Sequence, residues 1–132
     1  MVERVRKPIV FVIEDDESVR RSLGRLMRSE GFEVRLYEDP EHFLAEVVPT
    51  PEGCLVLDVS MPRMDGLTVQ AQLKSRGILM PVIILSARDS DETRRLAKSS
   101  GARFYLRKPV DDRTLIDAID WAVNSGEGPA AD

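Results

Sequence analysis

Five polar side chains in this sequence end or follow apolar runs, and their types suit the transfer of a phosphoryl group. They are three acids, one hydroxyl and one ammonium: Glu14, Asp15, Asp58, Ser86 and Lys108. Carboxylates brought together from different runs repel one another unless a cation lies among them or one is protonated. Oxygen ligands without histidine or cysteine favour Mg²⁺, with Mn²⁺ as a second candidate. These residues therefore predict a magnesium site with positions left open for phosphate oxygens.

Asp58 is the acid that we expect to react. It ends the apolar run 54–57, and Met61-Pro62 breaks the chain shortly after it. We predict that Asp58 is the nucleophile of a phosphoryl transfer and forms an aspartyl phosphate. Lys108 can pair with one phosphoryl oxygen and Ser86 can hydrogen-bond to another, so both would offset the charge of the transferred group.

The strands that must position these side chains can be read from the apolar residues. Continuous apolar runs at 9–13, 54–57 and 82–85 are typical of strands that are buried on both faces. Residues 32–36 alternate as a half-exposed strand does, and 104–106 form a last short run. A helical pattern follows each of these strands.

Capping residues mark where the predicted helices begin and end. The fourth predicted helix, at 91–99, is mostly polar. The expected caps and stops are Gly31, Asp39-Pro40, Pro49, Asp65, Gly77 and Asp111. Five strands alternating with five helices predict an α/β fold, with a doubly wound parallel sheet and helices on both faces. The site of such a sheet lies at the carboxyl ends of its strands.

The composition fits one soluble globular domain. The 132 residues carry a net charge of −4, so no basic surface for nucleic acid is expected. The sequence has one cysteine, Cys54, which excludes an internal disulfide. It has one histidine, His42, which excludes a histidine-rich metal site. No apolar run reaches the roughly 20 residues that span a membrane. We therefore expect a cytoplasmic protein without membrane contacts, with an N-terminal extension (1–7), a folded domain (8–124) and a flexible tail or linker (125–132).

Four motifs together resemble the receiver domain of bacterial two-component response regulators. They are Glu14-Asp15 after the first strand, Asp58 with Met61-Pro62-Arg63-Met64-Asp65-Gly66, Ser86-Ala87, and Lys108-Pro109. The resemblance covers residues 8–124 and includes receivers that precede a LuxR-type DNA-binding domain. It implies a flavodoxin-like five-stranded sheet in the order 2-1-3-4-5, and a signalling switch rather than an enzyme.

The resemblance also implies a set of metal ligands. Asp15 would bind Mg²⁺ directly, Glu14 would bind it through water, and Asp58 and the backbone carbonyl of Ser60 would complete the set. We place the acid pair at Glu14-Asp15 rather than Asp15-Asp16, because the first helix then packs in register. Asp15 and Asp16 could also be ordinary first-turn acids that the helix dipole favours. That alternative does not explain the other strand ends.

For the phosphoryl group, the resemblance implies that Ser86 and Lys108 hold it on Asp58. Tyr105 matches the aromatic residue that turns inward when the serine hydroxyl moves, so Ser86 and Tyr105 are predicted switch residues. The phosphodonor would be a histidine kinase. The output face would comprise helix 4, strand 5 and helix 5, with a possible homodimer through it on phosphorylation. The charges of 91–99 could select a partner or form only a solvated face.

Two outputs are compatible with these motifs. The tail at 125–132 could begin a linker to a DNA-binding domain, and phosphorylation would then control transcription. A stand-alone receiver that acts through protein contacts is equally compatible. Two other classes are disfavoured. A small Mg²⁺-dependent phosphatase would need an acid where Ser60 stands, and a flavin or nucleotide module would need a glycine-rich loop where residues 14–17 are all acidic.

Overall fold

Parallel strands set the positions of the side chains discussed above. The computed structural model describes residues 8–48, 53–58, 66–87, 95 and 102–125. The strands are β1 (Ile9–Ile13), β2 (Glu33–Tyr37), β3 (Gly53–Asp58), β4 (Val82–Ser86) and β5 (Phe104–Arg107). The helices are α1 (Glu17–Ser29), α2 (Pro40–Glu46), α3 (Gly66–Ser75) and α5 (Asp112–Ser125). The helix predicted at 91–99 and the cap predicted at Asp65 lie outside the described residues, residue 95 excepted.

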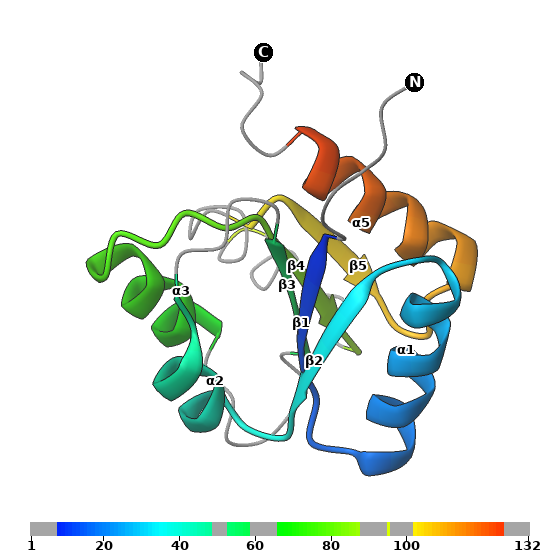
Figure 1. Cartoon of the computed structure of the whole chain (residues 1–132), viewed down its shortest axis with the longest axis horizontal. Coiled ribbons are helices and arrows are strands. Elements are labelled where there is room, and N and C mark those ends of the chain that lie inside the picture. Colours follow the sequence, from blue (N-terminus) through cyan, green and yellow to red (C-terminus); the bar gives the residue numbers. More distant parts are fainter. Residues whose placement is uncertain (1–7, 49–52, 59–65, 88–94, 96–101, 126–132) are drawn as a thin grey trace.

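The strands form one sheet in the order β2-β1-β3-β4-β5 (Figure 1). Every neighbouring pair in that order is parallel. The inner strands β1, β3 and β4 are buried along nearly their whole length. Their continuous apolar sequence fits this burial, because helices cover both faces of the sheet. The predicted doubly wound fold and the strand order that the resemblance implied are both confirmed.

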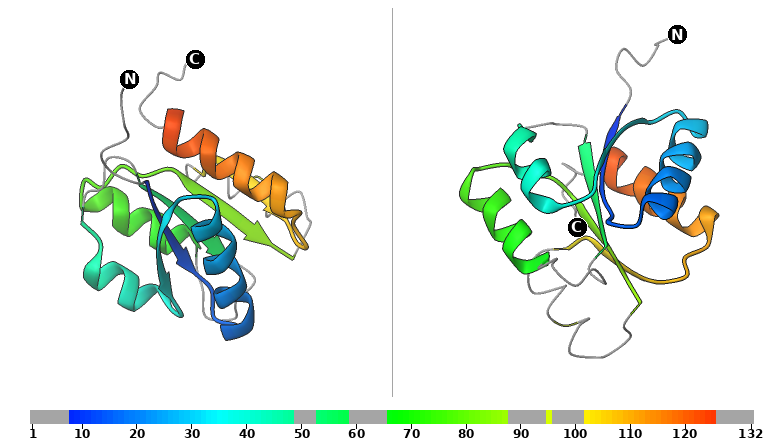
Figure 2. Two further views of the ribbon diagram at one scale, coloured as in Figure 1. Left: turned by 45° about the vertical axis from the view of Figure 1, so that its right-hand side comes forward. Right: turned by 90° about the horizontal axis from the view of Figure 1, so that it is seen from below.

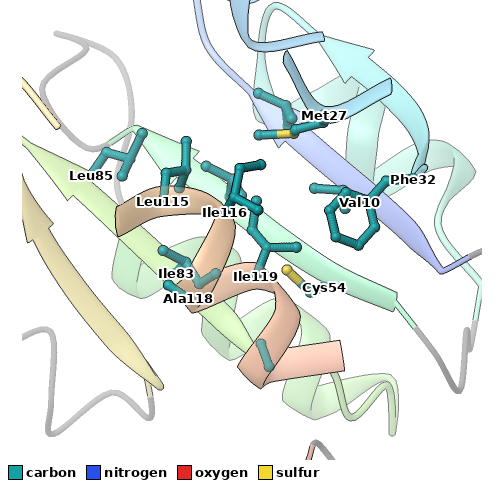
Figure 3. Packing of buried hydrophobic residues seen from close by; sticks show 13 residues of the cluster. Val10, Met27, Phe32, Cys54, Ile83, Leu85, Leu115, Ile116, Ala118 and Ile119 are labelled. Atoms are coloured by element: carbon teal, nitrogen blue, oxygen red, sulfur yellow. The ribbon is translucent and has the colours of Figure 1, made fainter. Parts of the chain in front are cut away.

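The core has two halves because alternate residues of each inner strand point to opposite faces of the sheet. On one face, Val10, Cys54 and Ile83 belong to a buried cluster with Met27 of α1 and Ile119 of α5 (Figure 3). On the other face, the alternate residues of the same strands pack with α2 and α3, and the cluster includes Phe11, Ile13, Leu55, Leu57, Ile84, Phe43, Val69 and Leu73. Figure 2 shows the two helix layers on opposite sides of the sheet.

Capping side chains fix where the helices begin. Asp16, Asp39 and Asp111 each accept a hydrogen bond from the backbone N–H three residues later, at 3.0, 2.9 and 3.1 Å respectively. Gly31 and Gly77 follow α1 and α3 with φ angles of 94° and 71°, a conformation in which other residues are strained. No described helix is long and apolar enough to cross a membrane.

β4, β5 and α5 each end one residue later than the sequence pattern predicts, at Ser86, Arg107 and Ser125. Two further boundaries differ for clear reasons. The pattern predicts a strand at 32–36 and a helix that continues to Pro49. The N–H of Phe32 donates to the carbonyl of Met27 at 3.2 Å and so closes α1, which delays β2 to Glu33–Tyr37. α2 ends at Glu46, because Val47 adopts an extended conformation and buries its side chain in the core.

Candidate functional site

The carboxyl ends of four strands lie at one edge of the sheet, and each carries a predicted site residue. Glu14 directly follows β1, Asp58 ends β3, Ser86 ends β4 and Lys108 directly follows β5. The parallel register keeps neighbouring strand ends level or one residue apart. The fold thus brings the chain's scattered polar residues to one place.

Three carboxylates form a cluster at this edge. Glu14, Asp15 and Asp58 each offer an oxygen atom, and these atoms all lie within 4.8 Å of one another. Glu14 and Asp58 are buried, with 1% and 2% of their surfaces exposed, whereas Asp15 is exposed. Two of the acids therefore sit in a setting where an uncompensated negative charge is costly.

Lys108 brings positive charge to the cluster. Its Nζ lies 2.7 Å from Oδ2 of Asp58 and 3.6 Å from Oε1 of Glu14. Burial lowers the pKa of Lys108, but the hydrogen bond and charge of Asp58, with a contribution from Glu14, outweigh burial and leave the pKa above its usual value. The backbone N–H of Lys108 donates to the carbonyl of Ser86 at 2.8 Å, which ties the two strand ends together.

The Glu14 carboxyl has a perturbed protonation equilibrium. Burial raises its pKa to about 7, assisted by the hydrogen bond and charge of Asp58 and opposed by the Asp16 N–H and Lys108. Oε2 accepts the Asp16 N–H at 3.1 Å. Oε1 is buried and has no hydrogen-bond partner among the described residues. A buried carboxylate oxygen of this kind calls for a proton or a cation.

These features fit a hard divalent cation. The donor set consists of three carboxylates, which outnumber the Lys108 ammonium beside them. Oε1 of Glu14 accepts no hydrogen bond from the described residues and so has room for a further ligand. Mg²⁺ is bound in proteins by such oxygens and retains several waters. Ser60, whose backbone carbonyl is a predicted ligand, lies outside the described residues.

The loop between β1 and α1 is held by contacts that the sequence pattern does not reveal. Asp16 caps α1 through Val19, so its carboxylate has a structural task next to the cluster. Nη1 of Arg20 donates to the backbone carbonyl of Glu14 at 2.8 Å. No short motif encodes a side-chain contact from the first turn of the helix back to the strand end, so sequence reasoning missed it.

The two predicted switch residues lie in neighbouring strands. Ser86 is 1% exposed at the end of β4. Tyr105 lies within β5 opposite Ile84 and packs, partly buried, against the core on the α2 and α3 face. Their predicted coupling remains a prediction.

Comparisons with known proteins are consistent with this geometry. The sequence matches the response regulator receiver domain family over residues 10–120. It is 39% identical over 114 residues to the transcriptional regulatory protein TdiR of Thauera aromatica, a match that covers 86% of this chain and 50% of TdiR. The chain spans about half the length of the curated relatives it matches.

Solved structures show the same likeness. The response regulator StyR and a response regulator receiver protein from Burkholderia phymatum are each 39% identical to this chain, with TM-scores of 0.81 and 0.76. The matches cover 90% and 89% of this chain, and 60% and 96% of the two solved chains.

Proposed function

Because this chain belongs to the response regulator receiver domain family, we propose that Asp58 accepts a phosphoryl group and that this modification switches the domain between two states. Receiver domains take the phosphoryl group from a histidine kinase. One observation carries the choice of residue: the buried Asp58 carboxylate lies 2.7 Å from the Lys108 ammonium, within the acid cluster. Burial and a specific charge partner at a strand end are typical of a reactive acid.

The proposed transfer forms one bond and breaks another. A carboxylate oxygen of Asp58 attacks the phosphorus of the kinase's phosphohistidine, and an O–P bond forms as the N–P bond breaks. The histidine ring leaves with the electron pair of that bond and takes up one proton. The product is an acyl phosphate on Asp58, so the chain catalyses only its own modification.

The other residues of the site would serve the phosphoryl group and the metal. Glu14, Asp15, Asp58 and the Ser60 carbonyl are the proposed ligands of Mg²⁺ or Mn²⁺, which when bound supplies positive charge to the phosphoryl oxygens. The ammonium of Lys108 stays charged at neutral pH, so it can pair with an anionic oxygen. Once Asp58 is phosphorylated, Lys108 would turn from the carboxylate to a phosphoryl oxygen. Ser86 would donate a hydrogen bond to another oxygen.

For the output, we propose that phosphorylation shifts a two-state equilibrium through Ser86 and Tyr105. The responding face would comprise the helix predicted at 91–99 together with β5 and α5, and a homodimer could form through it. We further propose residues 8–124 as the receiver unit and the cytoplasm as its location. The relative TdiR is named a transcriptional regulatory protein, which supports control of transcription as the output. We propose that this control would act through a DNA-binding domain.

The test of the phosphoacceptor is intact mass. The protein is incubated with Mg²⁺ and acetyl phosphate, and then weighed. We expect a gain of one phosphoryl group that hydroxylamine removes, as it does from an acyl phosphate. Borohydride reduction before proteolysis should convert Asp58 to homoserine and so locate the group.

Matched variants make this test specific. Asp58→Asn should abolish the gain, whereas Asp120→Asn, an exposed acid on α5, should leave it unchanged. Chelation of Mg²⁺ with EDTA should also abolish it. Undiminished labelling of Asp58→Asn, or homoserine at another position, would falsify the assignment.

A further inference from the structure

Arg20 differs from the other arginines of α1. Arg21, Arg25 and Arg28 are exposed, whereas Arg20 is partly buried and turns back to the loop that precedes the helix. Its Nη1 donates to the carbonyl of Glu14 at 2.8 Å. Its backbone N–H donates to the carbonyl of Asp16, also at 2.8 Å. One residue thus joins the start of α1 to both ends of the acidic segment 14–16.

The contact holds the peptide that links two acids of the cluster. The N–H of Glu14 donates to the carbonyl of Tyr37 at 3.0 Å, which extends the pairing of β1 and β2 by one residue. Arg20 holds the carbonyl at the other end of Glu14. Because a peptide unit is planar, the oxygen of Glu14 cannot be held without also orienting the N–H and Cα of Asp15.

The orientation of that peptide matters most for Asp15. The Glu14 side chain is also held by burial and by the Asp16 N–H. Asp15 is exposed, so the orientation of the peptide that carries it helps to set where its carboxylate reaches. Both acids belong to the cluster whose oxygens lie within 4.8 Å of one another.

We propose that Arg20 is a positioning residue for the cation site: by holding the Glu14 carbonyl, it directs the Glu14 and Asp15 carboxylates to one ion. This inference rests on the metal site of the proposed function. Two effects of Arg20 oppose each other, because its positive charge repels a cation while its hydrogen bond orients the ligands. Water and salt screen the repulsion at this partly exposed position, but they do not screen the orientation. Positioning should therefore prevail.

The experiment compares Arg20→Met with Arg21→Met. Both variants remove one positive charge from the same turn of α1, but Arg21 is exposed and pairs with Glu17 at 3.6 Å. Each protein is titrated with Mg²⁺ by calorimetry. We expect the dissociation constant of Arg20→Met to rise about 10- to 100-fold, as for the loss of other groups that orient metal ligands. Arg21→Met should bind Mg²⁺ as tightly as the original chain or more tightly.

A second readout needs no metal. In metal-free protein, the backbone amide resonances of residues 14–16 should shift more in Arg20→Met than in Arg21→Met, while circular dichroism shows equal helix content. If Arg20→Met does not fold, Arg20→Lys is compared with Arg21→Lys. Both variants keep the charge and lose only the guanidinium fork that reaches the Glu14 carbonyl from Arg20, so weaker Mg²⁺ binding by Arg20→Lys alone is expected. Unchanged or tighter Mg²⁺ binding by the Arg20 variant, or equal weakening in both variants, overturns the positioning role. If the original chain binds no Mg²⁺, the proposed metal site is wrong, and with it the positioning role, whereas the amide shifts still report whether Arg20 holds the loop.

Discussion

Lys108 contacts two buried carboxylates and offsets part of their charge. Replacing it with methionine should therefore destabilise the metal-free protein. Removing one partner of a fully buried ion pair costs roughly 3–5 kcal/mol. Since 26% of the Lys108 side chain is exposed, water offsets part of this cost, and we expect the free energy of unfolding to fall by about 1–3 kcal/mol. Urea denaturation without Mg²⁺ measures the loss.

Lys74→Met is the matched control, because Lys74 is exposed in the last turn of α3. Its unfolding midpoint should stay close to that of the original chain. Mg²⁺ should recover part of the loss in Lys108→Met, since its charge replaces that of the missing ammonium. Equal midpoints for the two variants would show that Lys108 does not compensate the buried acids.

Residue types at strand ends were predictable, but their contacts were not. An apolar run that stops on Asp58 or Glu14 marks a strand end, and parallel strands share one edge. The buried Oε1 of Glu14, which has no hydrogen-bond partner among the described residues, and the hydrogen bond from Arg20 depend on the angle at which α1 leaves the loop. No local pattern specifies that angle, so these features needed the structure.

Between elements, the close packing of α1 on β2 depends on Gly24. A Cβ at this position would lie 3.1 Å from Cδ1 of Leu36. Alanine improves helix propensity by about 1 kcal/mol, which the crowding opposes. Because Leu36 lies on an edge strand and can shift, we expect Gly24→Ala to be near neutral in urea denaturation. In a Leu36→Val background the same change should stabilise by about 1 kcal/mol. An equal effect in both backgrounds would exclude crowding by Leu36.

The start of α2 carries a pH-sensitive pair. The hydrogen bond and charge of Asp39 raise the pKa of His42, whose Nδ1 lies 2.9 Å from Oδ1 of Asp39. The pair therefore favours the folded state below the ordinary pKa of histidine, as long as Asp39 is ionised, and this contribution is lost as pH rises through the raised pKa of His42. NMR titration of the single histidine should show its pKa fall toward the ordinary value in Asp39→Asn. Asparagine still caps the helix. An unchanged pKa would contradict the pairing.

Element boundaries show where sequence patterns stop being informative. The apolar alternation around Phe32 fits a strand, yet the N–H of Phe32 belongs to the end of α1. In the sequence, Pro49 sets the latest position at which the helix can end. The helix α2 ends earlier, at Glu46, because Val47 is extended and packs in the core. The first shift arises from a local backbone hydrogen bond and the second from tertiary packing, and each moves a boundary by a residue or two.

On the scale of the whole molecule, Cys54 reports global unfolding. Its side chain is fully buried in β3, and burial raises the pKa of the thiol to about 12. A disulfide reagent at neutral pH should therefore react with it only after the sheet opens. The reaction rate should rise with urea in parallel with unfolding measured by circular dichroism. Fast labelling of the native protein would mean that β3 opens locally.

The architecture as a whole was only partly predictable from periodicity. Alternating strands and helices indicate a parallel sheet covered on both faces, because each crossover needs a helix. They do not determine the order β2-β1-β3-β4-β5, because the same alternation of strands and helices is compatible with other strand orders. The order came from the resemblance of the motifs to a family.

The hydrogen bond from the Lys108 N–H to the Ser86 carbonyl has a consequence for engineering. The ammonium and the hydroxyl of the site come from separate strands, but their backbones are joined where those strands end. A design that transplants this site to another scaffold must carry the ends of β4 and β5 together. Grafting the side chains alone would omit the backbone hydrogen bond that holds the two strand ends at their spacing.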